Sequence, residues 1–249
     1  MQIDNITILG IRPYTFFAGI AFLSAFIIIT YSLKSYKNEY RYIPQMVFEI
    51  ITNILLFGFG VGLVIEITKV ALTGDWSNIK SIDKCGFVAY GGIIGIIYTL
   101  NCFSAKHSLN RFLLNDTMSY TIPIAHGIAR LGCLFAGCCY GKEYYGFLSI
   151  YYIVKSVHCF PIQLIEAILN ITLGIALWYI KSQNKYMGCL INIYLLSYSV
   201  YRFILEFWRG DDVRGIFFGL SSSQYISMTV FVYAVVKIYF YNRKMRLYE

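Results

Sequence analysis

The stretch YTFFAGIAFLSAFIIITYSL, residues 14–33, decides the fold class of this chain. It contains no Asp, Glu, Lys or Arg. About 20 apolar residues in a helix are enough to cross the roughly 30 Å hydrocarbon core of a bilayer. We therefore expect this segment to be a membrane-spanning helix.

The composition of the whole chain points the same way. Of its 249 residues 58% are hydrophobic and only 14% are charged, and its mean hydropathy is +0.60. A soluble domain carries roughly 25% charged residues, so this chain has too few polar side chains to cover a core in water. Only four prolines and no low-complexity tract occur, which excludes a disordered or fibrous protein. The composition predicts a polytopic membrane protein.

The expected architecture is an all-α bundle of seven transmembrane helices, forming a single integral membrane domain over residues 1–249. Glycines recur between residues 127 and 147, where we expect a broken helix or a re-entrant turn. The seven near-span-length segments are residues 14–33, 45–72, 86–104, 117–137, 161–180, 188–208 and 222–241.

The positive charges predict the orientation of the bundle. With the N-terminus outside, the inner loops and tail carry ten Lys and Arg residues against seven on the outer side. A cluster of positive charges in the tail also favours the cytoplasmic side: Arg243, Lys244 and Arg246. We therefore expect the N-terminus outside and the C-terminus inside. The net charge of +8 therefore reflects topology and anionic lipid headgroups, and no nucleic-acid partner is expected.

Ionisable residues inside apolar spans are costly and by default mark a functional site. Arg130 is flanked closely by glycine on both sides, which lets a ligand approach, and guanidinium is a bidentate partner of phosphate. Lys69, Lys237 and Glu49 are better explained by snorkelling at helix ends. We expect Arg130 to bind an anionic group.

A second constellation places Tyr198, Arg202 and Glu206 on one helical face, because they are spaced by four. Arg209 follows one turn later at the expected water boundary. A self-neutralising Arg202–Glu206 pair is the alternative, although buried ion pairs seldom stabilise more than apolar substitutes. With Arg130, these arginines would suit a phospholipid headgroup.

Two further groups are weaker as physical signals. Gln163 and Glu166 lie on one side of a helix that begins at Pro161. Cys133, Cys138 and Cys139 are close in sequence, but a metal site normally needs more ligands at loop spacing, so we expect no metal. The seven cysteines form no secreted disulfide framework.

At these residues the chain resembles a bacterial family, the prolipoprotein diacylglyceryl transferases. Asp116 followed by GIARLGCLFAGCCYG at residues 127–141 is similar to the family signature, in a Gly-Cys-Cys-Tyr-Gly form. Four other motifs occur along the chain in the order expected for the family: IRPY at 11–14, YGG at 90–92, PIQLIE at 161–166 and YRFILEFWRGD at 201–211. The resemblance covers nearly the whole chain.

The resemblance implies transfer of diacylglyceryl from phosphatidylglycerol to the lipobox cysteine of a prolipoprotein, which forms a thioether and releases glycerol phosphate. It implies a multi-pass protein of the bacterial cytoplasmic membrane that needs no cofactor. The implied catalytic residues are Arg130, Arg202, Tyr90 and Glu206. The implied substrate-binding residues are Tyr14, Gly91, Gly92, Asp116, Cys133, Gly141, Gln163, Glu166, Tyr198 and Arg209.

The sequence departs from the family pattern where proton transfer is expected. Tyr90 stands where the family usually has His, Cys133 replaces Asn, Cys138 replaces an acidic residue, and Phe160 replaces the His before Pro161. The thiol must lose its proton to become a nucleophile. Tyr90, with an ordinary pKa near 10, is a weak base unless it ionises beside an arginine. His126, four residues before Arg130, is a possible substitute.

Two other function classes remain open at the level of sequence. An anion or lipid transporter would use the same intramembrane arginines, and internal repeats, of which none is visible, would favour it. A non-catalytic phospholipid-binding protein descended from the transferase would explain the loss of the family's His and Asn.

Overall fold

The structure is a computed structural model, and it describes residues 10–73, 88–152, 156–210 and 216–246. The chain forms two compact units. The first unit combines Met1–Ile29 with Asp116–Glu249, and the second is Thr30–Asn115. The single domain expected over 1–249 stays a prediction, and each unit is described here by itself.

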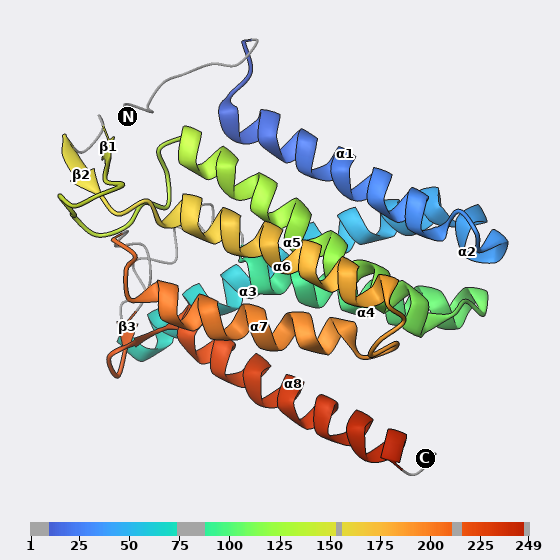
Figure 1. Ribbon diagram of the computed structural model, residues 1–249. Coiled ribbons are helices and arrows are strands. Elements are labelled where there is room, and N and C mark those ends of the chain that lie inside the picture. Colours follow the sequence, from blue (N-terminus) through green and yellow to red (C-terminus); the bar gives the residue numbers. More distant parts are fainter. Residues whose placement is uncertain (1–9, 74–87, 153–155, 211–215, 247–249) are drawn as a thin grey trace. The chain divides into compact units, whose positions relative to one another are not determined.

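Each apolar segment predicted from the sequence is helical in the described residues (Figure 1). One short helix, α2 (Lys37–Arg41), adds to them. The long helices are α1 (Pro13–Leu33), α3 (Ile43–Thr73), α4 (Ala89–His107), α5 (Arg111–Phe135), α6 (Ile162–Ser182), α7 (Leu190–Glu206) and α8 (Ser222–Arg246).

Three described helices are long and apolar enough to cross a membrane: α1, α3 over Ile43–Thr68, and α6. The expectation of a helical membrane protein is thus confirmed, whereas the count of seven spans stays a prediction. α5 and α7 depart from plain apolar spans because they carry Asp116, Arg130, Arg202 and Glu206. Such residues lower the mean hydropathy of a helix although the helix itself can be buried.

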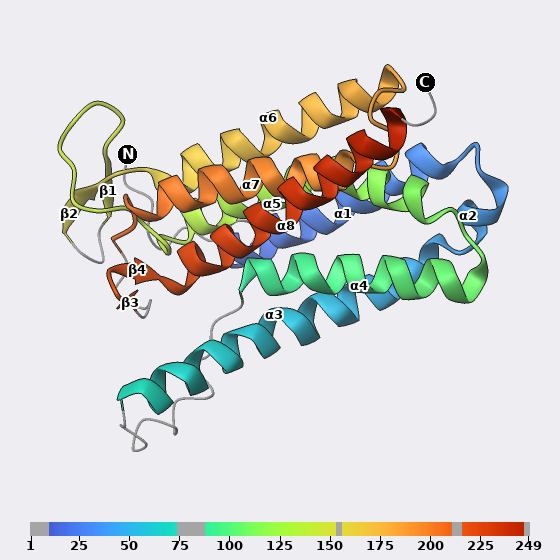
Figure 2. The ribbon, with the colours of Figure 1, turned by 90° about the horizontal axis from the view of Figure 1, so that it is seen from below.

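In the first unit α6 lies beside α7, and α7 beside α8 (Figures 1 and 2). α5 packs closely on α6, because a side chain at Gly127 would meet the Ala167 carbonyl oxygen at 2.9 Å. α1 packs on α5 through Phe17, whose ring stacks on that of Phe135 with centroids 5.3 Å apart. In the first unit α5 therefore contacts α1 and α6, and α7 contacts α6 and α8.

The break expected within residues 127–147 lies in the second part of that stretch. α5 is helical through Gly127 and Gly132 and ends only at Phe135. It stops with Gly137 at φ +66°, where the Cys138 amide donates to the Cys133 carbonyl at 3.2 Å and the Gly137 amide donates to the Leu134 carbonyl at 3.2 Å. This pair of hydrogen bonds is a Schellman cap. The irregular part therefore begins at residue 136.

Two small hairpins lie beyond the helix ends of the first unit. Strands β1 (Ile150–Tyr152) and β2 (Val157–Cys159) pair antiparallel, with Tyr151 opposite His158. Strands β3 (Ile216–Phe217) and β4 (Leu220–Ser221) form the second hairpin. Isolated bridges join Gly141 to Arg209 and Glu143 to Cys159, so the loop after α5 is tied to the ends of α7 and β2.

In the second unit α3 and α4 lie side by side (Figure 2). The contact is close at Gly91, because an added side-chain carbon there would collide with the Phe57 backbone carbonyl. The Val88 amide donates to the Gly58 carbonyl at 3.1 Å. Four of the seven cations expected on the outer side, Lys80, Lys84, Lys155 and Arg214, lie outside the described residues, as does one of the seven cysteines, Cys85.

Candidate active site

Glu166 of α6 is the centre of a buried ion-pair network in the first unit. Its Oε1 atom lies 3.0 Å from Nη2 of Arg130 on α5 and 4.0 Å from Nε of Arg202 on α7. The Glu166 side chain is 1% exposed and that of Arg130 is 11% exposed. Two guanidinium groups from different helices therefore meet at one carboxylate oxygen.

Arg202 also pairs along its own helix. Its Nη1 lies 2.7 Å from Oε2 of Glu206, one turn further on, and its Nη2 donates to Ser223 Oγ of α8 at 3.3 Å. Arg202 and Glu206 are both buried. The pair expected from the spacing of four thus exists, but it does not stand alone, because Arg202 is shared with Glu166.

Polar side chains on α6 and α7 hold this network in place. The Asn170 amide group donates to the Glu166 backbone carbonyl at 2.8 Å, and the Tyr201 hydroxyl donates to Asn170 Oδ1 at 2.7 Å. Asn170 is completely buried. A buried amide with satisfied hydrogen bonds fixes the α6–α7 register, so the carboxylate of Glu166 is held between the arginines.

Gln163, one turn before Glu166, ties the loop after α5 to α6. Its amide group donates to the Cys138 carbonyl at 2.6 Å, and its Oε1 accepts from the Tyr152 hydroxyl at 3.1 Å. Gln163 and Tyr152 are both buried. The two residues grouped from the sequence therefore have different contacts: Gln163 binds the loop after α5, and Glu166 makes the ion pairs.

Gly141 and Arg209 meet in the bridge between the loop after α5 and the end of α7. The Lys142 amide donates to the Trp208 carbonyl at 2.9 Å, and the Gly141 amide donates to the Phe160 carbonyl at 3.2 Å. A side chain at residue 141 would collide with the Phe160 carbonyl, which explains glycine there. This short ladder fixes the backbone of Arg209, which is itself buried.

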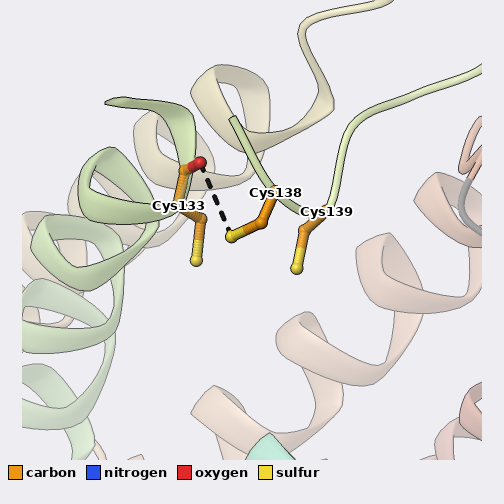
Figure 3. Close-up of side chains that lie close together, drawn as sticks. All are labelled: Cys133, Cys138 and Cys139. Carbon is orange, nitrogen blue, oxygen red and sulfur yellow. Dashed lines mark hydrogen bonds between the residues drawn. The ribbon is translucent and has the colours of Figure 1, made fainter. Parts of the chain in front are cut away.

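The thiols of Cys133, Cys138 and Cys139 lie close together at the end of α5 (Figure 3). Cys133 is buried, and the other two are partly exposed. Hydrogen bonds with Cys133 and Cys138, helped by the positive charges of Arg130 and Arg209, lower the pKa of Cys139. Tyr14 of α1 lies within electrostatic reach of Arg130 and the three thiols.

Comparisons with known proteins agree with the resemblance seen in the motifs. The family model described as prolipoprotein diacylglyceryl transferase matches residues 3–240. The chain belongs to this family. It is a membrane transferase of lipoprotein biosynthesis.

Individual relatives carry the same name. The chain is 36% identical over 152 residues to phosphatidylglycerol–prolipoprotein diacylglyceryl transferase 2 of Clostridium perfringens. The matched stretch is 59% of this chain and 59% of the relative. It is 29% identical over 234 residues to the corresponding transferase of Clostridium tetani, covering 91% of this chain and 92% of the relative. A Campylobacter hominis relative is 27% identical over 246 residues, covering 91% and 86%.

Asp116 of the transferase also lies on α5, but its contacts are with backbone amides and not with the arginines of the ion pairs. Its Oδ2 accepts from the Gly188 amide at 2.5 Å and its Oδ1 from the Leu190 amide at 3.2 Å. The carboxylate is completely buried and caps the start of α7. The substrate-binding role expected for Asp116 stays a prediction, and its contacts are those of a structural cap.

The two candidates for the proton acceptor fall in different units. The ring of His126 lies 5.6 Å from that of Tyr198, between centroids, and within electrostatic reach of Arg130, Glu166 and Arg202. Tyr90 is buried on α4 in the second unit, with Gly91 and Gly92 beside it. The structure thus brings His126 to the ion pairs, and the roles of the three α4 residues stay predictions.

Sequence reasoning missed some residues of the transferase site. Asn170 and Ser223 were overlooked because a single polar residue in an apolar helix has no periodic signal. Asn170 is, however, four residues after Glu166 and therefore on the same face of α6, which is a spacing that could have revealed it. The gathering of three thiols was also missed, because it depends on the helix cap rather than on spacing.

Proposed function

We propose that the protein transfers diacylglyceryl from phosphatidylglycerol to the lipobox cysteine of a prolipoprotein, forming a thioether. The observation that carries this proposal is the meeting of Arg130 and Arg202 at the buried carboxylate of Glu166. The names of the relatives in the two Clostridium species specify the same lipid and the same class of acceptor.

The network suits a phosphate ester that leaves during the reaction. Among the described residues, the buried Nε of Arg130 has no hydrogen-bond partner, so this guanidinium has a donor left for a phosphate oxygen. The sulfur of the acceptor forms a bond to the terminal glyceryl carbon while the bond from that carbon to the phosphate oxygen breaks. The electron pair leaves on glycerol phosphate, where Arg130 and Arg202 stabilise the developing charge.

The remaining residues of the site would position these arginines and the substrates. Glu206 fixes Arg202, Gln163 and Gly141 shape the loop that follows α5, and Arg209 adds a third positive charge at its edge. In this proposal Tyr14, Cys133 and Tyr198 line the route to Arg130, and the substrate-binding role of Gly91 and Gly92 rests on their motif alone.

The proton of the acceptor thiol has two proposed acceptors, Tyr90 and His126. Tyr90 is the candidate given by its place in the motif, and His126 is the candidate given by its position beside the ion pairs. A positioned base contributes typically 10²–10⁴ in rate, so removing the right one has a large effect.

The proposed location is the bacterial cytoplasmic membrane, with multiple spans, the N-terminus outside and the tail inside. The tail cluster supports this orientation. A reporter enzyme that works only in the cytoplasm can be fused after Glu249. We expect this fusion to be active. A tail-fused reporter active only outside the cytoplasm would contradict the topology without touching the chemistry.

The direct experiment incubates the purified protein with phosphatidylglycerol and a lipobox peptide, and measures the peptide mass. We expect the peptide to gain a diacylglyceryl group, and the same peptide with Ser in place of its cysteine to gain none. Binding of phosphatidylglycerol without a product would favour the lipid-binding alternative. Movement of the lipid across a vesicle membrane without a product would favour the transporter.

A further inference from the structure

The three cysteines after α5 form the densest group of metal-ligating atoms in the described part of the chain. The sulfur atoms of Cys133, Cys138 and Cys139 all lie within 4.8 Å of one another. Figure 3 shows their side chains pointing into one space, with Cys138 between the other two. None of the three is in a disulfide.

The helix cap explains how residues five and six positions apart come together. In a Schellman cap the second residue after the C-cap folds back onto the last turn of the helix. Its side chain commonly touches a side chain of that turn. Here those two positions are Cys138 and Cys133, whose backbone atoms share the capping hydrogen bond of 3.2 Å. The Cys138 thiol also donates to the Cys133 carbonyl at 3.7 Å. The contact that is usually apolar is therefore made by two thiols.

Cys139 joins them through an uncommon backbone conformation. Its φ is +60°, in the left-handed region that costs a non-glycine residue about 1–2 kcal/mol. The hydrogen bond from Gln163 to the Cys138 carbonyl and the ladder at Gly141 hold the backbone on either side. A residue kept in such a conformation is a reason to look for function rather than for packing.

Positive charge lies near the cluster. Arg130 and Arg209 are both close enough to act electrostatically on the Cys139 sulfur. Three thiolates around a divalent cation carry a net charge of −1, which a neighbouring guanidinium compensates. Small apolar packing would not need two of the three thiols to be partly exposed, as Cys138 and Cys139 are.

We propose that Cys133, Cys138 and Cys139 form a three-thiolate binding site for a thiophilic d¹⁰ cation, Zn²⁺, with a fourth position open to solvent. Tetrahedral Zn²⁺ with sulfur ligands at about 2.3 Å requires sulfur atoms about 3.8 Å apart, which small side-chain rotations achieve within this cluster. All three cysteines bind as thiolates, and the proton of each thiol that is still protonated passes to water. Three protein ligands with an open fourth position is the pattern of non-structural zinc sites.

The test measures metal binding in detergent with no lipid and no peptide, so its outcome is independent of the transferase proposal. The full-length protein is reduced and stripped of metal under anaerobic conditions and titrated with Co²⁺, then with Zn²⁺. We expect thiolate-to-cobalt charge-transfer absorption that saturates at one Co²⁺ per chain and disappears when Zn²⁺ is added.

Variants locate the site. Cys133→Ser, Cys138→Ser and Cys139→Ser are each expected to weaken Co²⁺ binding at least tenfold, by comparison with the 10–100-fold effect of losing even an outer partner of a metal ligand. Cys102→Ser, on α4 outside the cluster, is the matched control and should bind as the unaltered protein does. Unchanged helical circular dichroism shows that each variant is folded.

Two results would overturn the proposal. One is the absence of the charge-transfer band in the fully reduced, folded protein. The other is a band that persists undiminished in the Cys138→Ser and Cys139→Ser variants, which would place the bound metal on other residues.

Discussion

Two buried carboxylates in the first unit have opposite surroundings. Asp116 and Glu166 are 0% and 1% exposed. Asp116 accepts hydrogen bonds from two backbone amides at the start of α7, whereas Glu166 faces the guanidinium groups of Arg130 and Arg202. Both residues were expected from the sequence to contact substrate.

The two carboxylates differ in whether their partners can be exchanged for a ligand. Backbone amides at Gly188 and Leu190 cannot leave Asp116 without unfolding the start of α7. A guanidinium can rotate away from Glu166 toward a phosphate, because both ligands suit its bidentate geometry. In the structure Asp116 caps the start of α7 and Glu166 belongs to the proposed chemistry, while the substrate-binding role expected for Asp116 stays a prediction.

The largest expected effect is that of Arg130→Ala on thioether formation. Removing one buried donor to developing charge commonly lowers the rate by 10²–10³. Arg130→Lys should also be impaired, because an ammonium group cannot reproduce the planar fork. The measurement is the rate of diacylglyceryl transfer to a lipobox peptide.

Arg111→Ala, at the exposed start of the same helix, is the matched control and should retain the full rate. If Arg130→Ala were as active as this control, the proposed role of the ion-pair network would be wrong.

The next effect separates the two candidates for the proton acceptor. Tyr90→Phe removes only a hydroxyl group, and His126→Ala removes the imidazole. We expect loss of the true base to lower the rate of diacylglyceryl transfer by a factor of about 10² or more. Tyr98→Phe, on the exposed side of α4, serves as the control. Full activity of Tyr90→Phe together with a loss in His126→Ala would assign proton transfer to the region of the ion pairs. Full activity of both variants would exclude both residues.

Asp116→Asn tests the structural side of the comparison. Asn keeps one carbonyl oxygen but loses the charge and the second acceptor, so we expect the free energy of unfolding to fall by about 1.5–3 kcal/mol. The rate per folded molecule should stay close to that of the unaltered protein. Denaturant unfolding followed by circular dichroism measures the first quantity, with Glu143→Gln as an exposed control. A large loss of rate at unchanged stability would return Asp116 to the substrate site.

The smallest expected effect is that of Tyr201→Phe. This substitution removes the hydrogen bond to Asn170 that supports the backbone of Glu166, at a cost of about 1 kcal/mol in unfolding free energy. The same denaturant measurement applies, and Tyr179→Phe on the exposed face of α6 should change nothing. Equal stability of the two variants would show that this bond does not support the network.

Much of the fold was predictable, since long apolar segments leave few alternatives to helices. α1 (Pro13–Leu33) was predicted within one residue of each end, because Arg12 and Lys34 bound the apolar run. The end of α5 was not predictable in the same way. The sequence placed a break somewhere in residues 127–147 without saying at which glycine. Gly127 and Gly132 lie inside the helix and serve contact with α6 and α1, and Gly137 has the positive φ that ends the helix.

The residues of the ion-pair network were named from the sequence, but most of the pairs that they form were not. The spacing of four gave the Arg202–Glu206 contact directly. The contacts of Glu166 with Arg130 and Arg202 join three helices, and no spacing along one chain specifies a tertiary contact. The cap formed by Asp116 was hidden for the same reason, because its amide partners lie 72 and 74 residues away.

The most direct test of the account is the binding of phosphatidylglycerol to the folded protein without acceptor peptide, compared among the unaltered protein, Arg130→Ala, Arg202→Ala and Asp116→Asn. We predict that each arginine variant weakens binding at least tenfold, since a charge-assisted hydrogen bond contributes about 1.5–3 kcal/mol and 1.4 kcal/mol corresponds to a factor of ten. Asp116→Asn should bind as the unaltered protein does. Undiminished binding by both arginine variants, or an equal loss in folded Asp116→Asn, would contradict the assignment of the lipid phosphate to the Arg130–Glu166–Arg202 network.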